Sequence, residues 1–170
     1  MKSIEIQKNS HLVVPKTLTN NLLICGVFAS LLYAAMNIVF AMQYRGYSSA
    51  SQTVSELSAI DAPSRRLWVL LAMVYSVAGI AFGLGLWQPG TLNKRLRAVG
   101  TLIVVNAIIG LFWPPMHQRE VLAAGGGTIT DSLRIIFSVV AVLLMTFAMG
   151  FSAAAFRNWF RTFVNIGKIR

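Results

Sequence analysis

Four long apolar stretches without a charged residue constrain this chain more than any other feature. They cover residues 21–42, 68–87, 99–116 and 135–156. Each is about 18–22 residues long, enough to cross the roughly 30 Å hydrocarbon core of a bilayer as an α-helix. Lipid offers no hydrogen-bond partner to the backbone, so such a segment crosses as a helix rather than as a strand. The sequence therefore predicts an all-α, polytopic membrane helical bundle with about four transmembrane helices.

The composition supports a chain that is largely covered by lipid. Of its 170 residues, 56% are hydrophobic and only 12% are charged, whereas a soluble domain carries about 25% charged residues. The apolar stretches follow one another without a soluble region between them, so we expect one membrane domain over residues 1–170. The single cysteine, Cys25, permits no disulfide within the chain.

The placement of the basic residues predicts the orientation. Of the 15 lysines and arginines, ten lie in residues 1–20, 88–98 and 157–170, and five lie in residues 43–67 and 117–134. Basic residues accumulate on the cytoplasmic side of a membrane. We therefore expect both termini inside, a basic cytoplasmic tail over residues 157–170, and outer loops over residues 43–67 and 117–134. The net charge of +10 follows from this topology, and its short clusters do not indicate a nucleic-acid partner.

Small and polar residues inside the apolar stretches indicate how the helices pack. Gly79 and Gly83 form a G-x-x-x-G step, which lets another backbone approach closely, either within the chain or across a homo-oligomer. Asn37 and Asn106 are the most polar residues at membrane depth, and we expect them to form hydrogen bonds between helices. A substrate or ion pathway past these two amides is the alternative.

The carboxylates of the outer loops stand where helix N-termini favour them. Residues 53–56 (TVSE) and 128–131 (TITD) each have the form of a capping box, in which Glu56 or Asp131 reaches back to the threonine N–H. Asp61 stands just before Pro63 and the start of the second apolar stretch, near the positive end of a helix dipole. All three carboxylates thus have a structural explanation, with a binding role as the alternative.

His117 and Arg119 have no comparable structural explanation. They follow Trp113-Pro114-Pro115-Met116, a stiff exit from the membrane that fixes the direction of the imidazole. The histidine is either an interfacial hydrogen-bonding residue or an acid–base group. We predict a polar pocket on the outer face, in which carboxylates and arginine pair when no ligand is bound. Its expected lining is Glu56, Asp61, His117, Arg119 and Asp131.

We expect neither a cofactor nor a metal. The two histidines, His11 and His117, lie outside the predicted spans and on opposite sides, so they cannot ligate a haem together. Histidine, cysteine and carboxylate residues at zinc-ligand spacing are missing. The sequence also contains no P-loop, dinucleotide fingerprint or G-x-S-x-G elbow.

Two polar strings in the outer loops resemble motifs of a bacterial membrane family catalogued as domain of unknown function 998. The first string covers residues 52–59 and 62–65, and the second covers residues 115–119 and 130–133. The resemblance extends over roughly residues 20–157 and implies a multi-pass protein of the bacterial cytoplasmic (inner) membrane, without an established activity. Members of the family tend to continue into further spans, and a histidine often follows the Thr-Asp pair where this chain has Arg134.

These observations predict a small membrane protein that binds a small solute, a lipid headgroup or a partner protein through its outer pocket. Besides the bilayer itself, a homo-oligomer through Gly79 and Gly83 is the expected partner. One alternative is a membrane-embedded enzyme acting on a lipid or envelope precursor, with His117 as acid–base group and Arg119 holding phosphate. The other is an oligomeric transporter or channel, in which Asn37 and Asn106 line the path.

Overall fold

The structure is a computed structural model that describes residues 16–48, 50–88 and 93–167, with side chains as far as Arg157. Its long helices are α1 (Lys16–Gln43), α2 (Arg65–Trp87), α3 (Lys94–Leu111) and α5 (Ile129–Gly167). Two short helices, η2 (Val54–Ser58) and α4 (Arg119–Ala123), lie in the connections. The described residues contain no strand, so the all-α prediction is confirmed.

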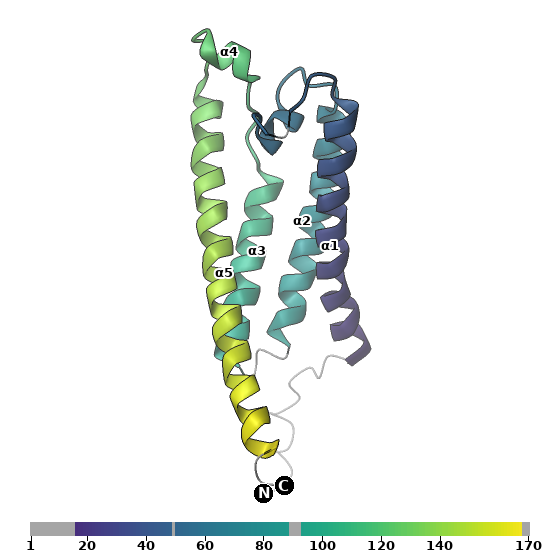
Figure 1. Ribbon diagram of the computed structural model, residues 1–170, viewed down its shortest axis with the longest axis vertical. Coiled ribbons are helices and arrows are strands. Elements are labelled where there is room, and N and C mark those ends of the chain that lie inside the picture. The colour runs from purple at the N-terminus through teal and green to yellow at the C-terminus, as the bar shows by residue number, and fades with distance from the viewer. Residues whose placement is uncertain (1–15, 49, 89–92, 168–170) are drawn as a thin grey trace, which may run out of the picture.

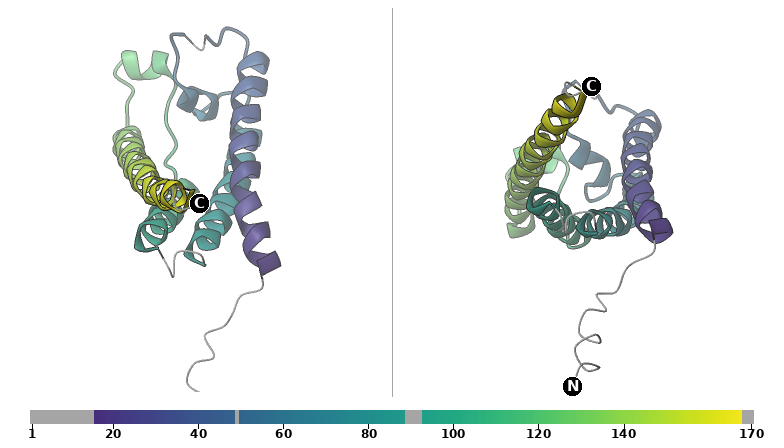
Figure 2. Two further views of the ribbon diagram at one scale, coloured as in Figure 1. Left: turned by 60° about the horizontal axis from the view of Figure 1, so that its bottom comes forward. Right: turned by 90° about the horizontal axis from the view of Figure 1, so that it is seen from below.

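The long helices form a curved row. Helix α1 packs on α2, α2 on α3, and α3 on α5. Seen from below in Figure 2, α1 and α5 stand at the two ends of this row and face each other across its concave side. The two long connections lie together at the upper end of the molecule, and η2 lies between the tops of the helices (Figure 1).

Three helices are long and apolar enough to cross a membrane: α1, α2 and α5 as far as Arg157. Only 11%, 22% and 6% of their most apolar windows, respectively, is buried within the chain. Apolar surface exposed on this scale is not found on a soluble monomer, but it is what lipid covers in a membrane protein. Three of the four predicted spans therefore coincide with helices suited to a bilayer.

Helix α3 differs from the predicted third span at both ends. It begins at Lys94 rather than Val99, because Asn93 Oδ1 accepts the Arg95 N–H at 3.0 Å and caps the first turn. It ends at Leu111 rather than Met116, since Pro114 and Pro115 cannot donate the backbone hydrogen bonds that would continue the helix.

Helix α5 also extends beyond the predicted fourth span, residues 135–156. It starts at Ile129 and continues without a break to Gly167, projecting below the other helices in Figure 1. Most of the predicted basic tail, residues 157–170, is therefore helical backbone. Residues 168–170 lie outside the described part of the chain.

The G-x-x-x-G step is used within the chain. A Cβ added at Gly83 would lie 2.6 Å from Val104 Cγ2 and 2.8 Å from the Gly100 carbonyl oxygen, and one at Gly79 would lie 3.2 Å from Ala107 Cβ. The absence of side chains at these positions is therefore what lets α2 and α3 approach. A dimer through the same face would have to displace α3.

We expect Gly83→Ala to destabilise the protein by about 1–3 kcal/mol, because the added methyl group overpacks a contact with backbone on the facing side. Gly150→Ala is the matched control, since a Cβ there meets nothing within 4 Å. Thermal unfolding in detergent measures both. Equal unfolding temperatures for the two variants would contradict a close α2–α3 contact at Gly83.

Candidate functional site

The two long connections, predicted as outer loops, are joined into one cap over the upper end of the row. The Ile60 N–H donates to the Met116 carbonyl at 2.7 Å, and Gln118 Nε2 donates to the Ile60 carbonyl at 3.3 Å. Arg119 Nη1 donates to the Ser51 carbonyl at 3.1 Å. Residues more than 50 positions apart in the chain are thus held together by hydrogen bonds to backbone carbonyl groups.

The side chain of Leu57 attaches this cap to the helices. It is 1% exposed and belongs to a buried cluster with Met36, Phe40 and Trp68. The rings of Phe40 and Trp68 meet edge to face, with centroids 5.5 Å apart. Helix η2 therefore packs between α1 and α2 and is not a free loop.

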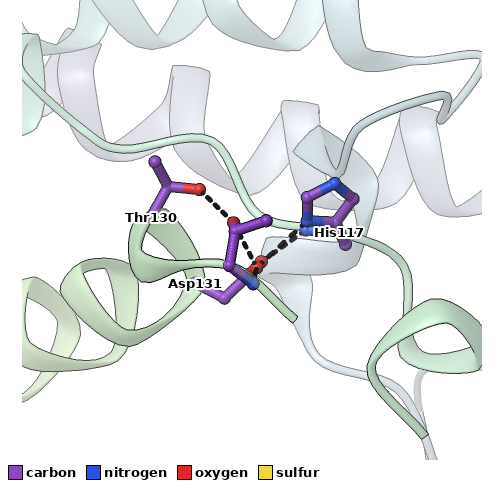
Figure 3. A network of polar contacts seen from close by, with 4 residues as sticks. His117, Thr130 and Asp131 are labelled. Atoms are coloured by element: carbon purple, nitrogen blue, oxygen red, sulfur yellow. Dashed lines mark hydrogen bonds and ion pairs between the residues drawn. The ribbon is translucent and has the colours of Figure 1, made fainter. Parts of the chain in front are cut away.

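Asp131 is the centre of a second connection, drawn in Figure 3. Its Oδ1 accepts the His117 N–H at 2.7 Å, and its Oδ2 accepts the Thr128 N–H at 2.7 Å and the Thr128 hydroxyl at 2.8 Å. The imidazole Nδ1 of His117 lies 3.0 Å from the same Oδ2. The carboxylate therefore both caps the first turn of α5 and fastens the segment that leaves α3.

These contacts favour the ionised form of Asp131, which lies in the first turn of α5, before the apolar stretch 135–156. The backbone hydrogen bonds from His117 and Thr128 hold its pKa well below the ordinary value, and burial opposes them only in part. Hydrogen bonds to a carboxylate stabilise its charged form. Asp131 is thus an anion at neutral pH, with its acceptors occupied.

Both predicted capping boxes are confirmed. Besides the Asp131 cap, Glu56 Oε1 accepts the Thr53 N–H at 3.1 Å at the start of η2. Asp61 has a different role, because it is exposed and adopts a positive φ of 67°. Aspartate tolerates this left-handed conformation better than most residues, so it forms the turn before α2.

The five predicted pocket residues do not come together as one pocket. His117 and Asp131 meet, but Arg119 binds the Ser51 carbonyl, Glu56 serves its own cap and Asp61 faces solvent. The expected pairing of carboxylates with arginine does not form, since in the described part of the chain the ion-pair contact found is His117–Asp131. None of the five lines the large cavity of the molecule.

That cavity, of about 1,020 Å³, is bounded by all four long helices and by η2. Its upper end, formed by η2 and the first turns of α2 and α5, carries hydroxyl and guanidinium groups. These are Thr53, Ser55, Ser58, Arg65 and Arg134. Its deeper wall is mainly apolar and includes Phe82, Ile103, Val142, Met145 and Met149. The hollow is therefore charged at one end and mainly apolar along its length, with hydroxyl and amide groups among the apolar side chains.

Arg134 is a candidate functional residue that was not among the five predicted from the sequence. It is 5% exposed, with Nη1 donating to the Pro114 carbonyl at 2.7 Å and Nη2 donating to Ser58 Oγ at 2.8 Å. Its guanidinium carbon lies 4.9 Å from the centroid of the Trp113 ring, a cation–π distance. Its Nε has no partner. The signal in the sequence was an arginine just ahead of an uncharged stretch, directly after the second polar string.

The two asparagines predicted at membrane depth behave differently from each other and from the prediction. Asn37 Nδ2 donates to the Tyr33 carbonyl of its own helix at 2.7 Å, so it forms no bond between helices there. Such local back-bonding satisfies a polar side chain without a neighbour. Asn106 lines the cavity, and its Oδ1 is buried without a partner. Asn106 alone thus remains a candidate for contact with a ligand.

Comparison of the chain with protein-family models, with curated proteins and with solved structures finds no match. The resemblance to domain of unknown function 998 therefore stays a prediction, and the site must be interpreted from its own geometry.

We expect Asp131→Asn to lower the unfolding temperature at pH 7, because an amide cannot accept from the His117 and Thr128 N–H groups with both of its ends. In the wild type, ionised Asp131 contributes to the free energy of unfolding, and this contribution is complete above the ordinary carboxyl pKa of 3.8. This stability is lost as the pH falls below that value toward the lower folded pKa. The difference in unfolding temperature between the two proteins should therefore stay constant above the ordinary pKa and begin to narrow as the pH is lowered from that value to pH 3.

Glu120→Gln is the control for this pH series, since Glu120 is an exposed carboxylate in α4. Its removal should leave the pH profile unchanged. A constant difference between wild type and Asp131→Asn down to pH 3 would show that the charge of Asp131 does not stabilise the fold.

Proposed function

We propose that the chain is a multi-pass protein of the bacterial cytoplasmic membrane in which α3 is a fourth transmembrane helix. Helix α3 is packed between α2 and α5, two helices suited to a bilayer, so it shares their depth. Its first turn carries Lys94, Arg95 and Arg97, which then lie at one membrane boundary. Arg95 Nη1 donates to the Ala154 carbonyl of α5 at 2.7 Å, so this guanidinium has a hydrogen-bond acceptor at the membrane boundary.

The orientation we propose places this basic end in the cytoplasm and the cap outside. Ten of the fifteen lysines and arginines belong to the segments at the basic end or beyond it, in agreement with the positive-inside rule. Four of the five carboxylates, Glu56, Asp61, Glu120 and Asp131, belong to the opposite end.

We propose further that the protein binds an amphiphilic molecule from the bilayer in its interhelical cavity. The observation that supports this is the 1,020 Å³ hollow with a polar outer end and an apolar wall. A cavity of this size can hold a drug-sized molecule or a large part of a lipid. Because α1 and α5 stand apart at the ends of the row (Figure 2), the concave side faces the lipid phase in a bilayer.

The length of the cavity favours an amphiphile over a small polar solute. From Arg134 to Met149, both of which line it, α5 advances about 22 Å at 1.5 Å per residue. This is a large part of the roughly 30 Å hydrocarbon thickness. The hydroxyls of Ser30, Ser138 and Thr146 on this wall already donate to carbonyls of their own helices. A polar solute therefore gains little from them, whereas an acyl chain needs no partner.

The orientation is tested by cysteine labelling in a Cys25→Ser background, which removes the single native thiol. We expect Glu120→Cys to react with a membrane-impermeant maleimide added to intact cells, and Lys94→Cys to react only after the membrane is opened. Labelling of both cysteines from the outside would overturn the proposed topology.

Ligand binding is tested by filling the cavity. Ala141 lines it, and we expect Ala141→Phe to reduce the lipid retained by the detergent-extracted protein several-fold, measured by native mass spectrometry. Val139→Phe is the control, because Val139 is 54% exposed on the same helix and does not line the cavity. Unchanged retention by a folded Ala141→Phe protein would contradict binding in this cavity.

A further inference from the structure

We infer that the outer end of the cavity binds an anionic phosphate group, the headgroup of the amphiphile, through the guanidinium groups of Arg134 and Arg65. The inference rests on the proposed binding function and names the class of its ligand. Both arginines line the cavity, and no aspartate or glutamate is among its lining residues.

The positive charge of Arg134 is buried without a counterion. Its described partners are the neutral Pro114 carbonyl, the neutral Ser58 hydroxyl and the Trp113 ring, and its Nε has none. Burial of a charge is costly unless an opposite charge compensates it. An anion bound in the cavity would supply the missing compensation.

The neighbouring carboxylates do not neutralise this end of the cavity. Asp131 lies one turn before Arg134, but its oxygens accept hydrogen bonds from His117 and Thr128. Glu56 accepts from the Thr53 N–H. Neither lines the cavity, and in the described residues neither forms an ion pair with an arginine.

The dipole of helix α2 reinforces the preference for an anion. Helix α2 begins at Arg65 and has no acidic residue in its first turn, whereas Asp131 stands in the first turn of α5. The partial positive charge of a helix N-terminus attracts anions and disfavours arginine there. Arg65 therefore adds to a positive potential at the start of α2 instead of offsetting a negative one.

Neutral hydroxyl groups surround the arginines at this end of the cavity. Thr53, Ser55 and Ser58 line it, but their hydroxyls are engaged with one another, with Glu56 Oε1 or with the Ser55 carbonyl. The phosphate contact is therefore assigned to the guanidinium groups, which bind phosphate through paired N–H donors. An amphiphile held in this way has its phosphate under the cap and its chain along Ile103, Met145 and Met149, as an outer-leaflet lipid does in the proposed orientation.

The test compares two lipids that differ only in the phosphate. Delipidated full-length protein in a neutral detergent is incubated with equal amounts of phosphatidic acid and of diacylglycerol with the same chains, and the bound species are counted by native mass spectrometry. We expect phosphatidic acid to be preferred by on the order of tenfold, as for a charge-assisted hydrogen-bonded contact. Arg134→Gln should reduce the preference to near unity.

Two further variants keep the test decisive. Arg65→Gln also removes a cavity guanidinium and should weaken the preference even if Arg134→Gln fails to fold. Arg66→Gln removes an exposed guanidinium that does not line the cavity, and it should retain the full preference. A preference lost equally in Arg66→Gln would show attraction to the basic chain in general and would overturn the inference.

The remaining outcomes separate the inference from the proposed function. Equal binding of both lipids, unaffected by the arginine variants, would overturn the phosphate site and leave the cavity proposal standing. Binding of neither lipid would overturn both. A further experiment with inorganic phosphate distinguishes a lipid headgroup from free phosphate as the bound anion. Displacement of phosphatidic acid by millimolar phosphate, with thermal stabilisation that Arg134→Gln abolishes, would support the anion site with free phosphate as its ligand.

Discussion

The hydrogen bond between Arg134 and Ser58 links the two ends of the helix row at the upper end of the molecule. Helices α1 and α5 stand at opposite ends of the curved row, and the packing order runs through α2 and α3. Ser58 belongs to the connection that follows α1, and Arg134 belongs to the first turns of α5, 76 residues later in the chain. Their 2.8 Å contact therefore joins the two ends of the row above the cavity. The glycine contact between α2 and α3 closes the opposite wall.

Lipid as the surrounding solvent explains why this arrangement is stable with so small a buried core. The buried hydrophobic cluster consists of Met36, Phe40, Leu57 and Trp68, which would be too little to fold a chain of this length in water. In a bilayer the apolar faces of α1, α2 and α5 gain nothing further from burial against each other. Close packing and polar contacts then determine the fold, and these are concentrated at the glycines of α2 and α3 and in the outer cap.

The features that depend on local sequence could be predicted, and those that depend on helix packing could not. Three helices suited to a bilayer follow from length and lack of charge, and both caps follow from four-residue patterns that end in Glu56 and Asp131. The predicted pocket residues do not form one ion-paired group, because Glu56 and Asp131 are engaged in the caps of their own helices and Asp61 faces solvent. Asn37 likewise found its acceptor four residues away. No local pattern could show that Arg134 would meet Ser58, since this depends on how the row curves.

The two roles of Arg134, as a link in the cap and as a charge at the cavity, lead to one physical consequence. A neutral residue of similar size could hold the cap by hydrogen bonds to the Pro114 carbonyl and Ser58 without placing a charge in a poorly solvated position. The arginine adds a cation between the face of Trp113 and the cavity, with Nε unpaired. A bound anion would remove that electrostatic cost and at the same time tighten the link between α5 and η2. Occupancy of the cavity and rigidity of the outer cap are therefore expected to rise together, through the same guanidinium group.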